Sequence, residues 1–227
     1  PGRYIFETID LVIGYDEPLS IPLPLSMERG QKIALVGANG IGKTTLLKSI
    51  LGLIPAISGT CELGENLQIG YFEQEVKGDN RTTCIEEIWQ EFPSFTQYEV
   101  RSALAKCGLT TKHIESQVRV LSGGEQAKVR LCKLVNRDTN ILLLDEPTAN
   151  IDPHTTAEIE RMLLSISERE GITIVTVTHN LAQAKRMCDR AIMMYAGDII
   201  DSGSSTKLLK DPGNDVTRKF VEGELLL

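Results

Sequence analysis

Residues 37–44 read Gly37-Ala38-Asn39-Gly40-Ile41-Gly42-Lys43-Thr44, and this stretch decides the fold that the sequence predicts. The apolar run over residues 32–36 predicts a buried strand before it, and residues 45–51 predict a helix after it. A strand, a glycine-rich loop and a Lys-Thr pair at a helix start form the context that a phosphate-binding loop requires. The alternative is an ordinary glycine-rich turn between a strand and a helix.

The chemistry of this loop gives its residues separate roles. Glycines let consecutive backbone N–H groups turn inward around a polyphosphate, and the helix N-terminus adds its partial positive charge. Lys43 is expected to reach the outer phosphates, and the Thr44 hydroxyl is placed to ligate Mg²⁺. The backbone of residues 39–45 is expected to cradle the phosphates, so the predicted binding residues are Asn39, Gly40, Gly42, Lys43, Thr44 and Thr45.

Length and composition indicate one globular domain over residues 1–227. Of the 227 residues, 41% are hydrophobic and 24% are charged, which suffices for a buried core. The net charge of −7 argues against a surface that coats nucleic acid. Five cysteines without a CxxC pair indicate reduced thiols in a cytoplasmic protein. No run is long enough to span a bilayer, no signal peptide is seen, and the start at Pro1 is expected to result from cleavage or processing.

The N-terminal part predicts an antiparallel β subdomain, mainly over residues 1–30 and 57–72. Residues 4–13 have the spacing of a strand, and residues 20–26, which contain prolines, form at best an edge strand. Residues 60–63 and 67–71 flank Gly64-Glu65-Asn66 and predict a hairpin or strand pair. These pieces are expected to form a sheet beside the nucleotide core.

From residue 83 the apolar period changes to that of helices. Ile85, Ile88, Trp89 and Phe92 recur at helical spacing, and a second stripe ends before Gly108. We interpret these apolar stripes as core packing. The sequence therefore predicts a helical insertion over residues 75–120. Together with the helix that follows and ends near residue 137, it makes a predicted helical subdomain over about 75–137.

The remaining sequence alternates strands and helices. Strands are predicted over 141–144 and 172–178, helices over 155–170 and 181–187, and a late hairpin over 191–195 and 198–201. Such alternation after a phosphate loop predicts an α/β fold, namely a P-loop NTPase core with a mostly parallel sheet covered on both faces.

A second anion site is predicted at Ser122-Gly123-Gly124-Glu125, which precedes a helix. Ser122 and Glu125 have the spacing of a capping box, and that structural role alone is the alternative interpretation. The capping box leaves the two glycines unexplained, and they expose bare backbone donors at a helix N-terminus.

Polar residues also follow the predicted core strands. Asp145 is expected to hold Mg²⁺ directly or through water, and Glu146 to face the attacking water as a general base or polarising group. His179 ends the next core strand at the same sheet edge, where we expect it to contact the γ-phosphate. Gln74 is expected to reach Mg²⁺ or the water. The alternatives are solvated acids before Pro147 and a histidine with a structural hydrogen bond.

In this order, the motifs resemble those of the ABC ATPase family over nearly the whole chain. Residues 37–44 match Walker A, Gln74 the Q-loop, 121–125 the family signature, 141–146 Walker B, 149–152 the D-loop and His179 the H-switch. The resemblance implies that ATP lies between Walker A of one cassette and the signature of another, in a head-to-tail homodimer or with a second ABC cassette. It also implies that Ser122 and Gly124 act across this interface, that Asp152 couples the sites and that Tyr15 stacks on adenine, with packing as the alternative for Tyr15.

Within the family the resemblance is split. Residues 4–146 resemble the second cassette of ABC-F translation factors, through Tyr71-Phe72-Glu73-Gln74 and residues 121–131. That subfamily normally reads Asn-His-Leu-Asp at the D-loop, where this chain has Ala149-Asn150-Ile151-Asp152. Residues 147–227 resemble the cassette of a bacterial importer of small ions. We therefore predict a chimera joined near residues 145–152.

Four functions follow from these resemblances. The first is a cassette that binds Mg-ATP and hydrolyses it as a dimer, with Glu146, His179 and Gln74 as catalytic residues and Thr44, Gln74 and Asp145 at the metal. The second is a fragment of a ribosome-associated translation factor, which the acidic balance disfavours. The third is the motor of an importer with transmembrane permease subunits. The fourth is an engineered hybrid that binds nucleotide with little turnover.

Overall fold

The computed structural model describes residues 4–73 and 79–224, and Gln74 lies outside them. A six-stranded sheet forms the centre of the molecule, with the strand order β5-β6-β7-β3-β8-β9. The first five strands run parallel, and β9 runs antiparallel to β8, so the predicted mostly parallel α/β sheet is confirmed. The strands are β5 (Ile69–Phe72), β6 (Ile141–Asp145), β7 (Thr173–Thr178), β3 (Lys32–Val36), β8 (Arg190–Tyr195) and β9 (Asp198–Ser204).

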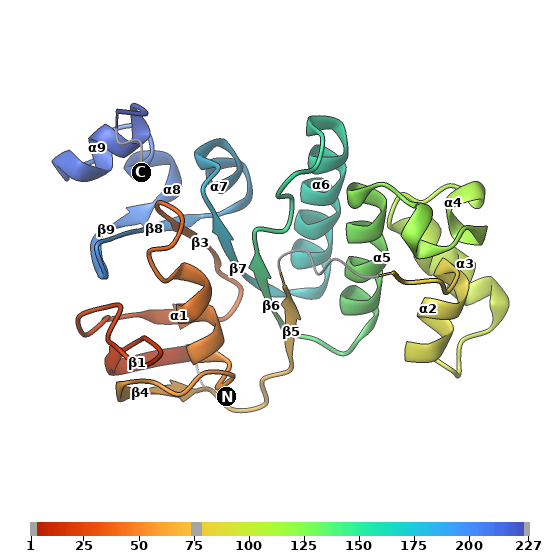
Figure 1. The fold of residues 1–227 in the computed structure, drawn as a ribbon, viewed down its shortest axis with the longest axis horizontal. Coiled ribbons are helices and arrows are strands. Elements are labelled where there is room, and N and C mark those ends of the chain that lie inside the picture. Colours follow the sequence, from red (N-terminus) through yellow and green to blue (C-terminus); the bar gives the residue numbers. More distant parts are fainter. Residues whose placement is uncertain (1–3, 74–78, 225–227) are drawn as a thin grey trace.

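The central strands bury side chains on both faces of this sheet. On β3, Ile33 and Leu35 join a core cluster with Leu46 of helix α1 (Lys43–Ile50). Ala34 and Val36 point the other way, into a cluster with residues of α6 (Pro153–Glu170) and α7 (Leu181–Met187). Because successive side chains of a strand point to opposite faces, β3 contributes to a hydrophobic core on each side of the sheet. Two short helices, α8 (Ser205–Leu208) and α9 (Asp215–Val221), follow β9 and lie near the C-terminus (Figure 1).

A second sheet has the order β2-β1-β4 and is antiparallel. It consists of β1 (Tyr4–Val12), β2 (Ser26–Glu28) and β4 (Ser58–Leu63). The strand expected over residues 20–26 starts only at Ser26, after a single bridge between Leu23 and Leu11. The expected pairing of 60–63 with 67–71 is wrong, because β4 pairs with β1 whereas β5 pairs in parallel with β6. Residues 69–72 of the predicted β subdomain thus belong to the core sheet.

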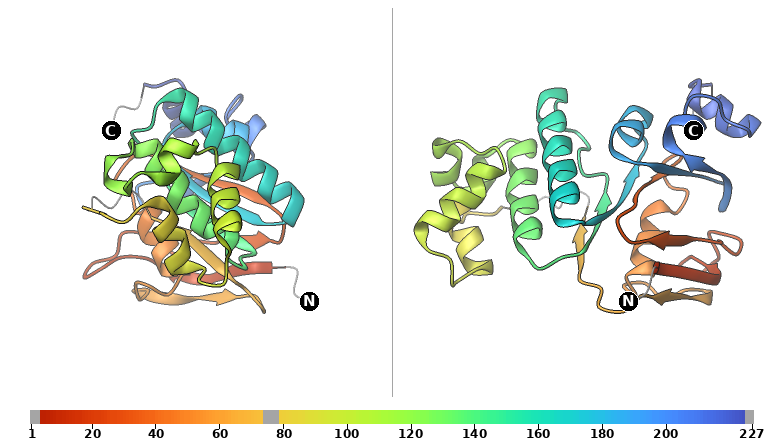
Figure 2. Two further views of the ribbon diagram at one scale, coloured as in Figure 1. Left: turned by 90° about the vertical axis from the view of Figure 1, so that its right-hand side faces the viewer. Right: turned by 180° about the vertical axis from the view of Figure 1, so that it is seen from behind.

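Helices form the end of the molecule farthest from α9 (Figures 1 and 2). They are α2 (Cys84–Glu91), α3 (Gln97–Lys106), α4 (Thr111–Glu115), the 3₁₀ turn η1 (Val118–Val120) and α5 (Gly123–Asn136). Their apolar side chains, among them Ile88, Leu104 and Val129, share a core cluster of their own. Ile85, Ile88 and Phe92 therefore pack in this core as predicted, whereas Trp89 is 36% exposed and lies outside the cluster. Among the described residues, no helix combines the length and apolar character needed to cross a bilayer.

Candidate functional site

The loop between β3 and α1 has a backbone that requires glycine. Gly40 and Gly42 have φ values of 77° and 98°, in the left-handed region that residues with a Cβ rarely adopt. At Gly37, a Cβ would lie 2.4 Å from the carbonyl oxygen of Met194 on β8. The glycines therefore let the loop turn tightly above the end of the sheet, with the first turn of α1 directly behind it.

Lys43 lies inside this loop, with 5% of its surface exposed. Its Nζ donates hydrogen bonds to the carbonyl oxygens of Gly37 at 2.9 Å and Ala38 at 2.5 Å. Burial lowers the pKa of Lys43, and the negative charges of Glu146 and Asp145 oppose that shift. A buried ammonium held by neutral carbonyls is incompletely compensated, so an anionic group above the loop would stabilise it.

Thr44 and Asp145 meet although 101 residues separate them in the sequence. The Thr44 hydroxyl donates to Asp145 Oδ1 at 2.9 Å, and the Tyr71 hydroxyl lies 3.4 Å from Oδ2. Asp145 is 1% exposed, and burial raises its pKa, while the Thr44 hydrogen bond opposes this effect. A hydroxyl beside a carboxylate is the oxygen donor set that Mg²⁺ takes in phosphate sites, where water and phosphate supply further ligands. The two residues therefore fit the predicted metal.

Glu146 and His179 form a second pair at the same sheet edge. His179 Nδ1 lies 3.0 Å from Glu146 Oε1, with side chains that are 57% and 11% exposed. Glu146 has a φ of 45°, and its N–H donates to the carbonyl oxygen of Val177 at 3.1 Å. A left-handed backbone at a residue other than glycine costs about 1–3 kcal/mol and is often found at functional sites. The turn after β6 thus holds the Glu146 carboxylate in a fixed place beside β7.

These residues surround a cavity of about 340 Å³. Its lining includes many of the residues that the sequence predicts, namely Tyr15, Asn39, Gly40, Gly42, Lys43, Thr44, Thr45, Glu146 and His179. Asp145 lies just beneath it through Thr44. Leu19 and Val177 also line the cavity and were missed, because nothing in their local sequence distinguishes them from packing residues. Tyr15 is 61% exposed at the rim, so its ring is accessible to a ligand.

The signature segment does not line this cavity in the single chain. The Ser122 hydroxyl accepts from the Glu125 N–H, and Glu125 Oε2 accepts from the Ser122 N–H, which completes the capping box of α5. Gly124 packs against α6, where a Cβ would lie 2.5 Å from Thr155 Cγ2. A Cβ at Gly123 would meet open space. Structural roles thus explain Ser122, Glu125 and Gly124 but leave Gly123 exposed at a helix N-terminus.

Asp152, the fourth residue of the predicted D-loop, is the N-cap of α6. Its carboxylate accepts from the Thr155 N–H at 3.0 Å, and these bonds at the helix N-terminus lower the pKa of Asp152. This hydrogen bond is sufficient to explain an aspartate at this position as a helix cap. A function in coupling two sites requires a second chain.

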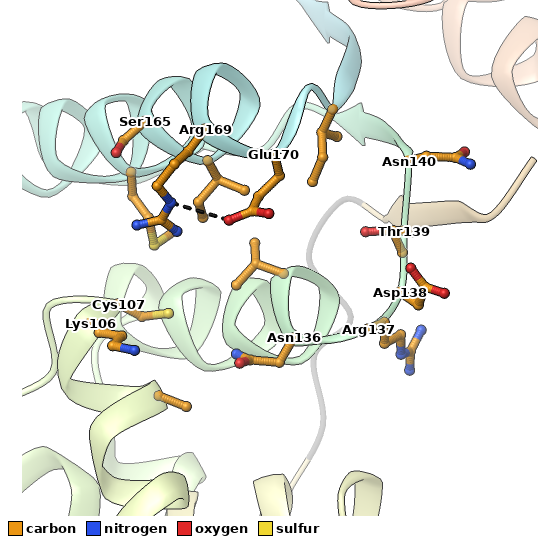
Figure 3. Close-up of a pocket in the computed structure, with 15 residues that line it drawn as sticks. Lys106, Cys107, Asn136, Arg137, Asp138, Thr139, Asn140, Ser165, Arg169 and Glu170 are labelled. Atoms are coloured by element: carbon orange, nitrogen blue, oxygen red, sulfur yellow. Dashed lines mark hydrogen bonds and ion pairs between the residues drawn. The ribbon is translucent and has the colours of Figure 1, made fainter.

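A larger cavity of about 710 Å³ lies between α3, α5 and α6 (Figure 3). Its lining includes Thr139 and Asn140, which precede β6, and Ile172, which precedes β7. It therefore lies at the amino ends of these strands, whereas ligands of parallel sheets collect at the carboxyl ends. Arg169 and Glu170 pair with each other in it at 3.2 Å. None of the predicted site residues that the structure describes lines this cavity, and the smaller one is the better candidate.

Similarity to known proteins shows the family of the chain. Residues 22–149 match the family model described as "ABC transporter", which is more than half of the chain. The chain belongs to the ABC transporter family. Over 178 residues, or 78% of the chain, it is 66% identical to "Uncharacterized ABC transporter ATP-binding protein YfmM" of Bacillus subtilis and covers 34% of that protein. The chain spans about a third of the length of the first curated relatives that it matches.

Other relatives belong to different branches of the ABC family. The chain is 33% identical to "ABC transporter F family member 2" of Arabidopsis thaliana, with 98% of this chain and 33% of that protein covered. It is 31% identical to "Phosphate import ATP-binding protein PstB" of Thermococcus kodakarensis, with 98% and 99% covered.

Solved ABC proteins share the fold of this ABC domain. An inward-facing structure of a metal-chelate type ABC transporter superposes with a TM-score of 0.82 at 19% identity and covers 98% of this chain and 90% of that one. A dimeric structure of the ATP-binding cassette MJ0796 with ADP and Pi superposes with a TM-score of 0.75 at 20% identity, over 88% and 98%. This ABC domain therefore has the fold of a nucleotide-binding cassette.

Proposed function

We propose that this ABC domain binds Mg-ATP and hydrolyses it to ADP and phosphate in a head-to-tail dimer. One observation carries the proposal: the buried ammonium of Lys43, the Thr44–Asp145 pair and the Glu146–His179 pair converge on one cavity. Each group matches a part of a bound triphosphate or its metal. The predicted signature, residues 121–125, lies at the start of α5 and does not line that cavity, so it can face the cavity of a second copy.

Binding rests on the phosphate loop. Lys43 exchanges its contacts with the Gly37 and Ala38 carbonyls for phosphate oxygens, which carry the opposite charge. The backbone N–H groups of residues 39–45 and the N-terminus of α1 add donors and a positive potential. Thr44 and Asp145 would hold Mg²⁺, which neutralises phosphate charge and orients the triphosphate. Tyr15, exposed at the rim, offers its ring to the adenine.

Hydrolysis rests on the Glu146–His179 pair. A carboxylate at the end of β6 lies where it can accept a proton from water that attacks the γ-phosphorus. His179 lies within 3.0 Å of this carboxylate and is more exposed, so it can contact the γ-phosphate and hold Glu146 in place. Gln74, the third predicted catalytic residue and a predicted metal ligand, lies outside the described residues and stays a prediction.

The second copy is proposed to supply the other half of the site. Ser122, Gly123 and Gly124 present backbone and hydroxyl donors at the N-terminus of α5. Facing the cavity of a partner, these donors would add electrostatic stabilisation where charge develops on the γ-phosphate. Asp152 caps α6 close to that surface and is proposed to couple the two sites. ATP would then act as the bridge between the chains.

For the wider role of this ABC domain, two partners remain predictions, the ribosome and a transmembrane permease. The relatives include an ABC transporter F family member and import ATP-binding proteins. The predicted chimera also stays a prediction. Separate searches with residues 1–145 and 153–227 test it, and one parent that covers both segments equally well would exclude it.

The dimer is tested with Glu146→Gln, which keeps the size of the side chain but removes the base. We expect this variant to bind ATP, to lose more than about 100-fold in turnover and to elute as a dimer in size-exclusion chromatography when ATP is present. Lys43→Ala is the control and is expected to remain a monomer, because its loop has lost the phosphate contact. A Glu146→Gln variant that stays monomeric at high ATP would contradict the proposal.

A further inference from the structure

A buried amide lies behind the Glu146–His179 pair. Gln183, in the first turn of α7, is 1% exposed. Its Nε2 donates to Thr148 Oγ1 at 2.7 Å and to Glu160 Oε1 at 3.2 Å. Both N–H bonds of the side-chain amide are therefore used, each toward a different element of the fold. A buried polar group of this kind is costly unless it is fully paired, so its position is sharply defined.

The acceptor Glu160 is itself firmly held. It lies on α6, is 4% exposed, and accepts two hydrogen bonds from the Arg186 guanidinium of α7 at 2.7 and 2.8 Å. This contact raises the pKa of Arg186 above its usual range. The Glu160 charge is thus compensated without Gln183, and Glu160 serves as a fixed point to which the Gln183 amide is anchored.

The two ends of this network lead to the two proposed catalytic side chains. Thr148 follows Glu146 by two residues, within a turn closed by the Ala149 N–H bond to the Glu146 carbonyl oxygen at 3.1 Å. The backbone N–H of Gln183 donates to Asn180 Oδ1 at 3.0 Å, next to His179. The loop after β6 and the loop after β7 are therefore joined behind the site through a single side chain.

We propose that Gln183 is a positioning residue that fixes the separation of Glu146 and His179 by tying Thr148 to the start of α7. The inference rests on the proposed function, since it concerns the same ATPase site. The hydrogen bonds of Gln183 go to Asn180, Thr148 and Glu160, and none of these three residues belongs to the phosphate loop. Its loss should therefore affect turnover much more than nucleotide binding.

Two variants remove the link from opposite ends. Gln183→Met keeps the length of the side chain and removes the amide, and Thr148→Val keeps the shape and removes the hydroxyl. Each is expected to lower kcat about 10-fold while KM for ATP stays within about twofold, because the interaction orients reacting groups. The double variant should lose no more than either single one, since both break the same bond. Thr148→Ser keeps the hydroxyl and should restore kcat.

The matched control is Ser167→Ala, which removes another buried hydrogen bond of α6, from Ser167 Oγ to the Ile172 carbonyl oxygen at 2.6 Å. It is expected to lower stability by an amount similar to that of Thr148→Val and to leave kcat unchanged. A kcat loss of the same size in the control would show that general destabilisation explains the effect and would overturn the proposal.

A second readout needs no turnover. The chain has three histidines, so the ring ¹H–¹³C NMR signals of the nucleotide-free protein can be assigned by single substitution. Gln183→Met and Thr148→Val are expected to shift the His179 ring signals and to leave those of His113 and His154 in place. Unshifted His179 signals in both variants would overturn the inference even if ATPase activity were absent from the wild type, an outcome that would by itself contradict only the proposed function.

Discussion

Two neighbouring glycines at the start of α5 have opposite surroundings. Gly124 is buried against Thr155 of α6 and Ile151 of the segment before α6, to which a Cβ would approach within 2.5 and 3.1 Å. Gly123 is exposed, and a Cβ there would meet nothing within 4 Å. Packing therefore accounts for the glycine at position 124, whereas no contact within one chain requires a glycine at position 123.

This contrast predicts different responses to the same substitution. Gly124→Ala is expected to lower the free energy of unfolding by about 1–3 kcal/mol, because α5 must move away from Thr155. Gly123→Ala should change it by less than about 0.5 kcal/mol, as for other exposed sites. Urea denaturation of both variants measures the difference. Equal stability of the two would show that α5 and α6 adjust freely, contrary to the packing described.

Single residues could be predicted from the sequence where local pattern and topology agree. The Thr44–Asp145 contact follows from a loop motif and from the rule that parallel strands end at one edge. Leu19 and Val177 could not be found in this way, since an apolar residue at a cavity looks like one in the core. The Gln183 network was also invisible, because its partners Thr148 and Glu160 lie far away in the sequence and a polar residue on a helix normally faces water.

At the scale of elements, charged hydrogen bonds hold α2 against α5. Glu87 of α2 accepts hydrogen bonds from Lys133 of α5 and from Asn80 and Thr82 of the segment before α2. One turn further along α2, Glu91 pairs with Arg137 at 2.6 Å. Burial raises the pKa of Glu87, but the hydrogen bonds from Lys133, Thr82 and Asn80 outweigh it, so the pKa is lowered.

The lowered pKa makes stability depend on pH in a defined direction. The native pKa of Glu87 lies below its value in the unfolded chain, about 4.3. Its contribution is therefore present above that pH and is lost as the pH falls through the native value. Glu87→Gln should cost about 1–2 kcal/mol at pH 7 and should weaken the loss of stability below about pH 4.3. Urea denaturation from pH 3 to 7 checks this, and parallel curves for the two proteins would contradict it.

The wrong prediction for β5 has a physical cause at this same scale. Gly64-Glu65-Asn66 is a good local turn signal, and Asn66 indeed adopts a φ of 54°. The chain after it nevertheless pairs Ile69 with Ile141, far along the sequence. It does so because β6 pairs with β7 on one side only, and its other edge has unpaired backbone groups that β5 can bind. Long-range pairing of this kind overrides turn chemistry, and local patterns carry no information about it.

At the scale of the whole molecule, the two proposed halves of the site lie on different elements of the fold. The cavity lies at the carboxyl ends of β3, β6 and β7. Gly123 starts α5, which packs both on the other helices of the helical subdomain and on the core sheet cluster. Figure 1 shows α5 beyond α6 on the side away from α1. Because the glycine-rich end of α5 does not line the cavity of its own chain, two copies related by twofold symmetry would form two composite sites.

Composite sites predict complementation between two inactive variants. Lys43→Ala loses the phosphate loop but keeps its signature, and Gly123→Asp keeps the loop but places a negative charge where the γ-phosphate of the partner is expected. Open space around Gly123 means that the aspartate should leave the fold intact. A mixed dimer has one complete site, whereas a homodimer of either variant would have none. At saturating protein and ATP the mixture should therefore reach between about a quarter of the wild-type rate per chain, the value for random pairing, and about half, the value if only mixed dimers form. The rate per chain of the wild type should rise with protein concentration until dimerisation is complete. A rate that is independent of concentration, together with an inactive mixture, would show that one chain forms the whole site.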